Sequence, residues 1–228
     1  MARITVFGSG AMGTAVAMHL ARRGNDTALW ASPFDAGVLE ALRTERRHPG
    51  LPEHLPDALI VFGPDELKAA ADGVEIAVMG AHSGGARTLA RLVREGCGDL
   101  PLVVGVAKGL ERTSGKRMSE VYADEVGHDG VVSMGGPCLA PELAHDLPGA
   151  AVLASLDLGS ADACASAFRA PTFRVDVTDD VVGVEYCTLA KNVAAIGMGM
   201  LDGFGKVANL DYRNAKAALF TMAIDELI

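Results

Sequence analysis

The chain has 228 residues, of which 50% are apolar, 21% charged and 5% aromatic, a composition typical of a compact α/β protein rather than a disordered one. Its formal net charge of −9 argues against binding to nucleic acid or to an anionic membrane surface, because both require a positive field. No signal peptide is evident and no stretch reaches the roughly 18 apolar residues of a membrane span, so we expect a cytoplasmic protein without membrane insertion.

The four cysteines and six histidines lack the spacings that metal ligands show. Neither a C-x-x-C pair nor an H-x-x-x-H pair occurs, so the sequence indicates neither a zinc site nor a disulfide framework. We therefore expect reduced cysteines in packing roles and no bound metal.

The first elements predict a βαβ unit. Residues 3–7 are a short apolar run rich in β-branched side chains, and a glycine cluster and a run of good helix formers at 15–23 follow it. After the break at Gly24-Asn25, residues 26–30 predict a second strand, which closes the unit.

Strand and helix patterns then alternate along the chain. This alternation predicts a Rossmann-type, doubly wound, mostly parallel sheet with helices on both faces. The direction of the last two strands is left open. The predicted strands are 59–62, 74–79, 102–106, 130–134, 150–154 and 173–177, and the predicted helices are 36–46, 65–70, 84–95, 116–126, 141–146 and 160–169.

From about residue 180 onward only helices are predicted. Residues 182–200 form a long helical pattern with one apolar stripe, a loop is expected at 201–209 around its glycines, and a final helix at 211–228 is expected to be capped by Asp211. The stripe consists of Leu189, Val193, Ile196 and Met200. We predict a dinucleotide-binding domain at 1–180 and the start of an all-helical C-terminal domain at 181–228.

The glycine cluster matches G-x-G-x-x-G between a strand and a helix. Gly8 permits the tight turn, Gly10 lets the backbone approach a pyrophosphate, and Gly13 lets helix and strand pack closely. The helix N-terminus that follows supplies amide donors and a favourable dipole. This context predicts a bound nicotinamide dinucleotide.

The sequence does not choose between NAD and NADP. The acidic residue expected about twenty positions after the motif, which would bind the NAD ribose, is absent at the end of the second strand, and Asp35 comes late for that role. No arginine stands there to bind a 2′-phosphate, while Ser32 could bond to either group.

Two further segments follow predicted strands at the edge where such sheets bind ligands. Lys108-Gly109 places a cation either beside nicotinamide and substrate or in a solvated loop. The small residues of GGPCLA at 135–140 either let backbone amides approach a ligand or form a plain turn. No histidine is recognisably placed to activate Cys138, which argues against a nucleophilic cysteine.

Lys191-Asn192 lies on the long helix that begins the second region. Thr188, Lys191 and Ala195 share a helical face roughly opposite the apolar stripe, so Lys191 is expected either to point toward the cofactor domain or to be an ordinary solvated lysine.

In this order the motifs resemble the soluble, nicotinamide-dependent glycerol-3-phosphate dehydrogenase family. The resemblance spans nearly the whole chain, and the K-G and L-A-K-N-V signals are more specific than the glycine motif. The segments that carry it are GSGAMGTA (8–15), the LW that ends the second strand, VAKGLE (106–111), GGPCLAPELA (135–144), EYCTLAKNVAAIGMGMLDGFG (185–205) and NAKAALFTMAIDEL (214–227).

The resemblance implies an oxidoreductase that interconverts sn-glycerol 3-phosphate and dihydroxyacetone phosphate with NAD or NADP. It implies that Lys191 accepts the proton of the C2 hydroxyl and that Lys108 contacts both substrate and cofactor. Gly136, Cys138 and Asn192 would bind the substrate. The glycine motif, Ser32 and Lys108 would bind the cofactor, and Ala11, Met12 and Ala140 would touch it.

Two departures from the family pattern bear on this expectation. The family commonly has serine where this chain has Cys138, which weakens a hydroxyl hydrogen bond. The family's later aspartate and the Arg-Asn pair that holds the substrate phosphate are not found, and Arg213-Asn214 lies too early to be that pair. We therefore expect either an incomplete chain or impaired catalysis, with exposed apolar surface that favours a homodimer.

Two alternatives stay open. A related ketopantoate or 2-hydroxyacid-type reductase also has an N-terminal glycine motif and a lysine on the interdomain helix, although VAKGLE and GGPCLAPE favour a phosphorylated polyol substrate. A catalytically impaired nucleotide-binding module would keep Gly8 to Gly13 without needing Lys108 or Lys191.

Overall fold

The computed structural model describes residues 2–226 and contains one eight-stranded sheet with the strand order β3-β2-β1-β4-β5-β6-β7-β8. Strands β1 to β6 pair in parallel, while β7 runs antiparallel to β6 and parallel to β8. The predicted Rossmann-type sheet is confirmed, and the two last strands run opposite to the others. The strands are β1 (Arg3–Phe7), β2 (Asp26–Trp30), β3 (Ile60–Phe62), β4 (Ile76–Met79), β5 (Leu102–Gly105), β6 (Val131–Gly135), β7 (Gly149–Ala154) and β8 (Phe173–Thr178).

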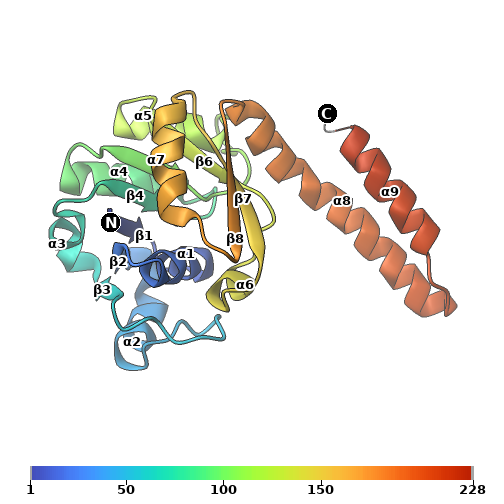
Figure 1. Cartoon of the computed structure of the whole chain (residues 1–228), viewed down its shortest axis with the longest axis horizontal. Helices are drawn as coiled ribbons and strands as arrows, with labels where there is room; N and C mark the ends of the chain where they lie inside the picture. Colours follow the sequence, from blue (N-terminus) through green and yellow to red (C-terminus); the bar gives the residue numbers. More distant parts are fainter. Residues whose placement is uncertain (1, 227–228) are drawn as a thin grey trace.

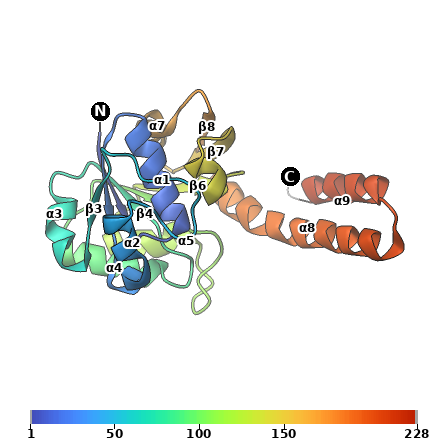
Figure 2. The same ribbon diagram turned by 90° about the horizontal axis from the view of Figure 1, so that it is seen from below.

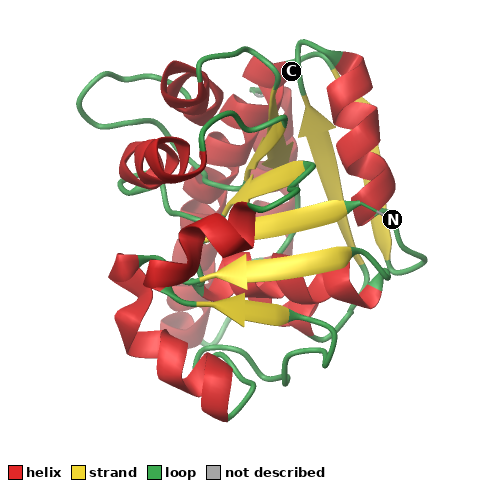
Figure 3. Ribbon diagram, turned by 90° about the vertical axis from the view of Figure 1, so that its left-hand side faces the viewer, coloured by secondary structure: helices red, strands yellow, loops and turns green. Residues whose placement is uncertain are grey.

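Helices cover both faces of the sheet (Figure 3). Helices α1, α6 and α7 pack on one face, and α3, α4 and α5 pack on the other. Their bounds, with two 3-10 turns, are α1 (Ala11–Arg22), η1 (Pro33–Asp35), α2 (Ala36–Thr44), η2 (Pro64–Glu66), α3 (Leu67–Ala71), α4 (Ala86–Cys97), α5 (Met118–Val126), α6 (Ala140–Ala144) and α7 (Leu158–Phe168).

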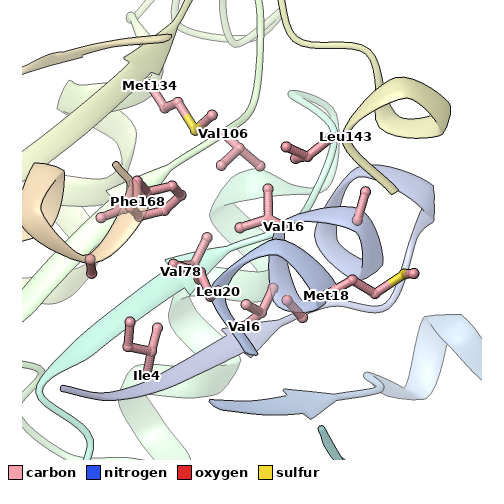
Figure 4. Close-up of a cluster of buried hydrophobic side chains, with 14 of the residues drawn as sticks. Ile4, Val6, Val16, Met18, Leu20, Val78, Val106, Met134, Leu143 and Phe168 are labelled. Carbon is pink, nitrogen blue, oxygen red and sulfur yellow. The ribbon is translucent and has the colours of Figure 1, made fainter. Parts of the chain in front are cut away.

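The two apolar cores follow from the period of two along each strand. Val6 of β1 faces the α1 side, whereas its neighbour Phe7 faces the α4 side. Figure 4 shows the first core, in which Val16 and Leu20 of α1 lie against the sheet. All four side chains are fully buried, which stabilises the fold by about 1.5–3 kcal/mol each.

Helices α8 (Val181–Ala208) and α9 (Arg213–Asp225) form a hairpin that projects away from the sheet domain (Figures 1 and 2). The side chain of Asp180 caps α8 by accepting a hydrogen bond from the Gly183 amide. Most of the predicted apolar stripe is exposed, with 71% of Val193 and 66% of Ile196 accessible. No helix within residues 2–226 has the length and apolar character needed to cross a bilayer.

The loop predicted at 201–209 is wrong, because α8 continues through Ala208 and turns only at Asn209, which adopts a left-handed conformation. Glycine has a low helix propensity, but Gly205 lies within the helix and allows the backbone at Leu210 to come close. A Cβ at Gly205 would lie 2.6 Å from the carbonyl oxygen of Leu210.

The predicted cap of the last helix is also wrong. Tyr212 is the N-cap residue of α9 and makes no side-chain capping bond, while the Asp211 carboxylate pairs with Arg213 instead. The end of that predicted helix, residues 227 and 228, lies outside the described residues.

Candidate cofactor and substrate site

A cavity of about 760 Å³ opens at the carboxyl ends of β1, β2, β4 and β5. It lies where the strand order reverses between β1 and β4, the place at which open α/β sheets bind ligands. Its size is that of a small-molecule site. The lining includes Gly8, Gly10, Ala11, Met12, Ser32, Phe34, Asp35, Gly80, His82, Ser83, Val106 and Lys108.

The glycine loop is shaped for a pyrophosphate. Gly8 has a φ of +102°, and a Cβ at Gly13 would come within 2.2 Å of the Gly8 carbonyl oxygen. A Cβ at Gly10 would meet only one atom, the Gly80 carbonyl oxygen at 4.0 Å, so the space in front of Gly10 is open. Gly10 caps α1 without a side chain, which leaves the first amides of the helix for an anion. These residues fit a dinucleotide.

Asp35 lies beside this loop despite its distance along the sequence. Its Oδ2 accepts hydrogen bonds from the Ser32 amide at 2.9 Å, the Ser32 hydroxyl at 2.6 Å and the Ser9 amide at 3.2 Å. The 3-10 turn η1 folds Asp35 back over the end of β2. The carboxylate therefore reaches the glycine loop, although Asp35 comes late in the sequence for a ribose-binding residue.

Lys108 and Lys191 meet next to the cavity. The Lys191 Nζ donates a 2.8 Å hydrogen bond to the Gly136 carbonyl oxygen. Burial lowers the pKa of Lys191, and the positive charge of Lys108 lowers it further. Lys108 lines both the large cavity and a small adjoining one with Gly136 and Cys138.

Cys138 and Gly136 are among the residues that line the small adjoining cavity. Burial raises the pKa of the Cys138 thiol, although the charges of Lys108 and Lys191 oppose the shift. The thiol is thus protonated at neutral pH, which agrees with a lining role and not with a nucleophile. Gly136 has a φ of +119°, and a Cβ there would lie 2.9 Å from the Ala150 carbonyl oxygen.

The remaining predicted site residues lie outside the large cavity. Gly13 packs against Gly8, Ala140 begins α6 against the first core, and the Asn192 side chain is exposed on α8. The structure thus gathers several predicted residues around one cavity, with Lys191 bonded to Gly136 of the small adjoining cavity; those around the large cavity are Gly8, Gly10, Ala11, Met12, Ser32 and Lys108.

Sequence reasoning missed the role of Glu185, which joins α8 to the sheet domain. Its Oε1 accepts hydrogen bonds from the Ser119 amide at 2.8 Å and the Ser133 hydroxyl at 3.0 Å, and its Oε2 accepts one from the Ser119 hydroxyl at 2.7 Å. Arg117 Nη1 lies 3.2 Å from Oε2. No spacing of residues signals this network, because its members are far apart in the sequence.

Comparison with known proteins gives two family matches. Residues 3–161 match the family model of the NAD-dependent glycerol-3-phosphate dehydrogenase N-terminus, and residues 180–228 match that of the C-terminus. Among curated relatives, glycerol-3-phosphate dehydrogenase [NAD(P)+] of Thermoanaerobacter sp. (strain X514) is 35% identical over 225 residues, which cover 99% of this chain and 66% of the relative.

A second relative and a solved structure agree. Glycerol-3-phosphate dehydrogenase [NAD(P)+] 2 of Salinibacter ruber is 37% identical over 98% of this chain and 64% of the relative. The crystal structure of glycerol-3-phosphate dehydrogenase from Coxiella burnetii superposes with a TM-score of 0.85 at 30% identity, covering 98% of this chain and 66% of that one. The chain thus spans about two thirds of the length of the relatives it matches. The predicted family is confirmed, and the chain belongs to the NAD-dependent glycerol-3-phosphate dehydrogenases.

Proposed function

We propose that this chain carries the cofactor site and the general base of an oxidoreductase that interconverts sn-glycerol 3-phosphate and dihydroxyacetone phosphate. The observation that supports this most strongly is the position of Lys191, whose Nζ is held at the Gly136 carbonyl oxygen next to Lys108 and the cavity. Two relatives carry the name of this dehydrogenase, which supports the same substrate pair.

The glycine loop and the start of α1 would bind the dinucleotide. The first turn of α1 has no side-chain cap, its residues Ala11 and Met12 line the cavity, and the helix dipole favours the negative pyrophosphate there. A bound nicotinamide ring accepts a hydride during alcohol oxidation and gives it back during ketone reduction.

Lys191 would move the proton. Its lowered pKa increases the neutral fraction of the amine near neutral pH, so the amine can take the proton of a substrate hydroxyl during oxidation. In the reverse direction the ammonium group would protonate the ketone oxygen. The bond to Gly136 holds Nζ in place, which reduces the entropy lost in reaching the reactive geometry.

Lys108 would both attract the substrate and tune the pKa of Lys191. Its cation would attract an anionic polyol phosphate to a chain whose net charge is −9, and its field lowers the pKa of the neighbouring Lys191. Gly136 and Cys138 would line the substrate side, and Asn192 and Ala140 remain proposed contacts for substrate and cofactor.

The domain division and the association state are also proposals. We place the boundary at 180/181, where Asp180 caps α8. The exposed Val193, Ile196 and Met200 support burial of this stripe in a homodimer, which light scattering on the purified chain would test. Cytoplasmic localisation and the lack of nucleic-acid binding remain predictions from the sequence.

A substrate comparison tests the proposal. Reduced dinucleotide is mixed with the protein and with dihydroxyacetone phosphate or ketopantoate, and its oxidation is followed by absorbance. We expect turnover with dihydroxyacetone phosphate and little with ketopantoate. Preference for ketopantoate would overturn the substrate assignment, and dinucleotide binding without turnover of either ketone would favour a nucleotide-binding module.

A further inference from the structure

We propose that Asp35 makes this chain select NAD(H) over NADP(H), an inference that rests on the proposed dinucleotide site. The family models are named for NAD, whereas the curated relatives are named for NAD(P)+, so the names alone do not decide which dinucleotide this chain prefers. In the structure, however, a carboxylate stands at the β2 end of the cavity, and three donors hold it in place through one oxygen, Oδ2.

The other oxygen of Asp35 is available to a ligand. Within residues 2–226, Oδ1 accepts no hydrogen bond, while the side chain as a whole lines the cavity. In this fold the adenosine ribose lies at the end of the second strand, next to the glycine loop. A ribose 2′-hydroxyl there can donate a charge-assisted hydrogen bond to Oδ1. Of the two dinucleotides, only NAD(H) has this free hydroxyl.

A 2′-phosphate in the same place would meet a carboxylate and no cation. Within the described part of the chain, Lys108 is the one lysine or arginine that lines the cavity, and it follows β5, which is separated from β2 by the two strands β1 and β4. The negative 2′-phosphate and the negative carboxylate would repel each other without a neighbouring cation, and this repulsion disfavours NADP(H).

The arginines that follow η1 in the sequence are bound elsewhere. Arg43 pairs with Glu66, Arg46 donates to backbone carbonyls at 56 and 59, and Arg47 donates to the Leu51 carbonyl. The negative charge of Asp35 acts on His48 and tends to raise its pKa. Burial nevertheless lowers the pKa of His48, so at neutral pH this imidazole supplies no positive charge.

Direct binding measurements test the inference without any turnover. NADH and NADPH are titrated against the whole chain, followed by the fluorescence of the reduced nicotinamide. We expect NADH to bind at least about tenfold more tightly, the ratio for one charge-assisted hydrogen bond gained or lost. Asp35→Asn keeps an acceptor for Ser9 and Ser32 but removes the charge. The variant should therefore bind NADPH more tightly than the wild type does, and the ratio of NADH to NADPH affinity should become smaller.

Two variants complete the design. Glu66→Gln changes the equivalent capping carboxylate of η2, outside the cavity, and should leave the ratio unchanged. Phe34→Arg places a cation at an exposed rim position of the cavity without touching the Asp35 bonds, and should raise NADPH affinity even if Asp35→Asn folds poorly. Equal affinities of the wild type for NADH and NADPH, or tighter binding of NADPH, would overturn this inference and leave the proposed function standing. Binding of neither dinucleotide would overturn the proposed function together with it.

Discussion

Glu185 of α8 and Ser119 of α5 form a two-point contact, in which the Ser119 amide and hydroxyl donate to the two carboxylate oxygens at 2.8 and 2.7 Å. Lys191 lies six residues further along the same helix. The contact therefore fixes the rotation of α8 about its axis and, with it, the direction in which Lys191 points.

Glu185→Ala should destabilise the fold and misplace Lys191. Removing the carboxylate leaves the buried Ser119 and Ser133 groups without their partner, which costs about 1–3 kcal/mol of the free energy of unfolding. Denaturant unfolding and steady-state kinetics check both effects. We expect kcat to fall while NADH affinity stays within error, and the exposed Glu40→Ala should change neither. Loss of NADH affinity instead of kcat would argue against the positioning role.

Gly10→Ala and Gly13→Ala should fail in different ways. A Cβ at Gly13 would overlap the Gly8 carbonyl oxygen at 2.2 Å, so Gly13→Ala should lower the melting temperature. A Cβ at Gly10 has room in the protein, so Gly10→Ala should fold normally but block the approach of the pyrophosphate. Thermal unfolding and NADH titration of both variants would separate these outcomes, and normal NADH affinity in Gly10→Ala would contradict the assigned binding mode.

The order of elements could be predicted from the sequence because it depends on local patterns. Alternating apolar strands and helices gave the sheet, and the glycine motif gave the edge where the cavity lies. The end of α8 could not be predicted, because the low helix propensity of glycine favours a loop at 201–209. At Gly205 the tertiary approach of the Leu210 carbonyl oxygen matters more.

The position of Asp35 and the role of Glu185 escaped sequence reasoning for a related reason. Asp35 is far from the glycine motif along the chain, but a 3-10 turn folds its carboxylate back toward Ser9. Glu185 acts through partners on α5 and β6, more than 50 residues away. A single sequence contains no periodic signal for contacts of this kind.

His19 should make the protein less stable in mild acid. It is 1% exposed, its Nε2 donates to the Phe168 carbonyl at 2.7 Å, and within residues 2–226 its Nδ1 has no partner. Burial lowers its pKa below the ordinary 6.5, so the unfolded chain binds the proton first as the pH falls.

The contribution of neutral His19 to the free energy of unfolding should therefore be fully present above the ordinary pKa of 6.5. Below that pH the free energy of unfolding should decrease, by at most about 1.4 kcal/mol per pH unit. Denaturant unfolding of the wild type and His19→Gln at a series of pH values provides the measurement. The slope between pH 6.5 and the lowered folded-state pKa should flatten in His19→Gln. Identical slopes for the two proteins would rule out this assignment.

Lys108 should set the pH at which oxidation becomes efficient. Because the neutral amine of Lys191 accepts the proton, kcat/KM for alcohol oxidation should rise with pH toward the Lys191 pKa. Lys108→Ala removes a positive charge that lowers this pKa, so the rising limb should move to higher pH. The exposed Lys68→Ala should leave the limb in place. An unmoved limb in Lys108→Ala would show that the two lysines are not coupled.

The most direct test of the central claim is the turnover of Lys191→Ala with dihydroxyacetone phosphate and reduced dinucleotide. Lys206→Ala, which removes an exposed lysine from the same helix, is the matched control. We predict that Lys191→Ala binds NADH as the wild type does but loses about 10²- to 10⁴-fold in kcat, while Lys206→Ala keeps its activity. Wild-type turnover in Lys191→Ala would contradict its assignment as the general base.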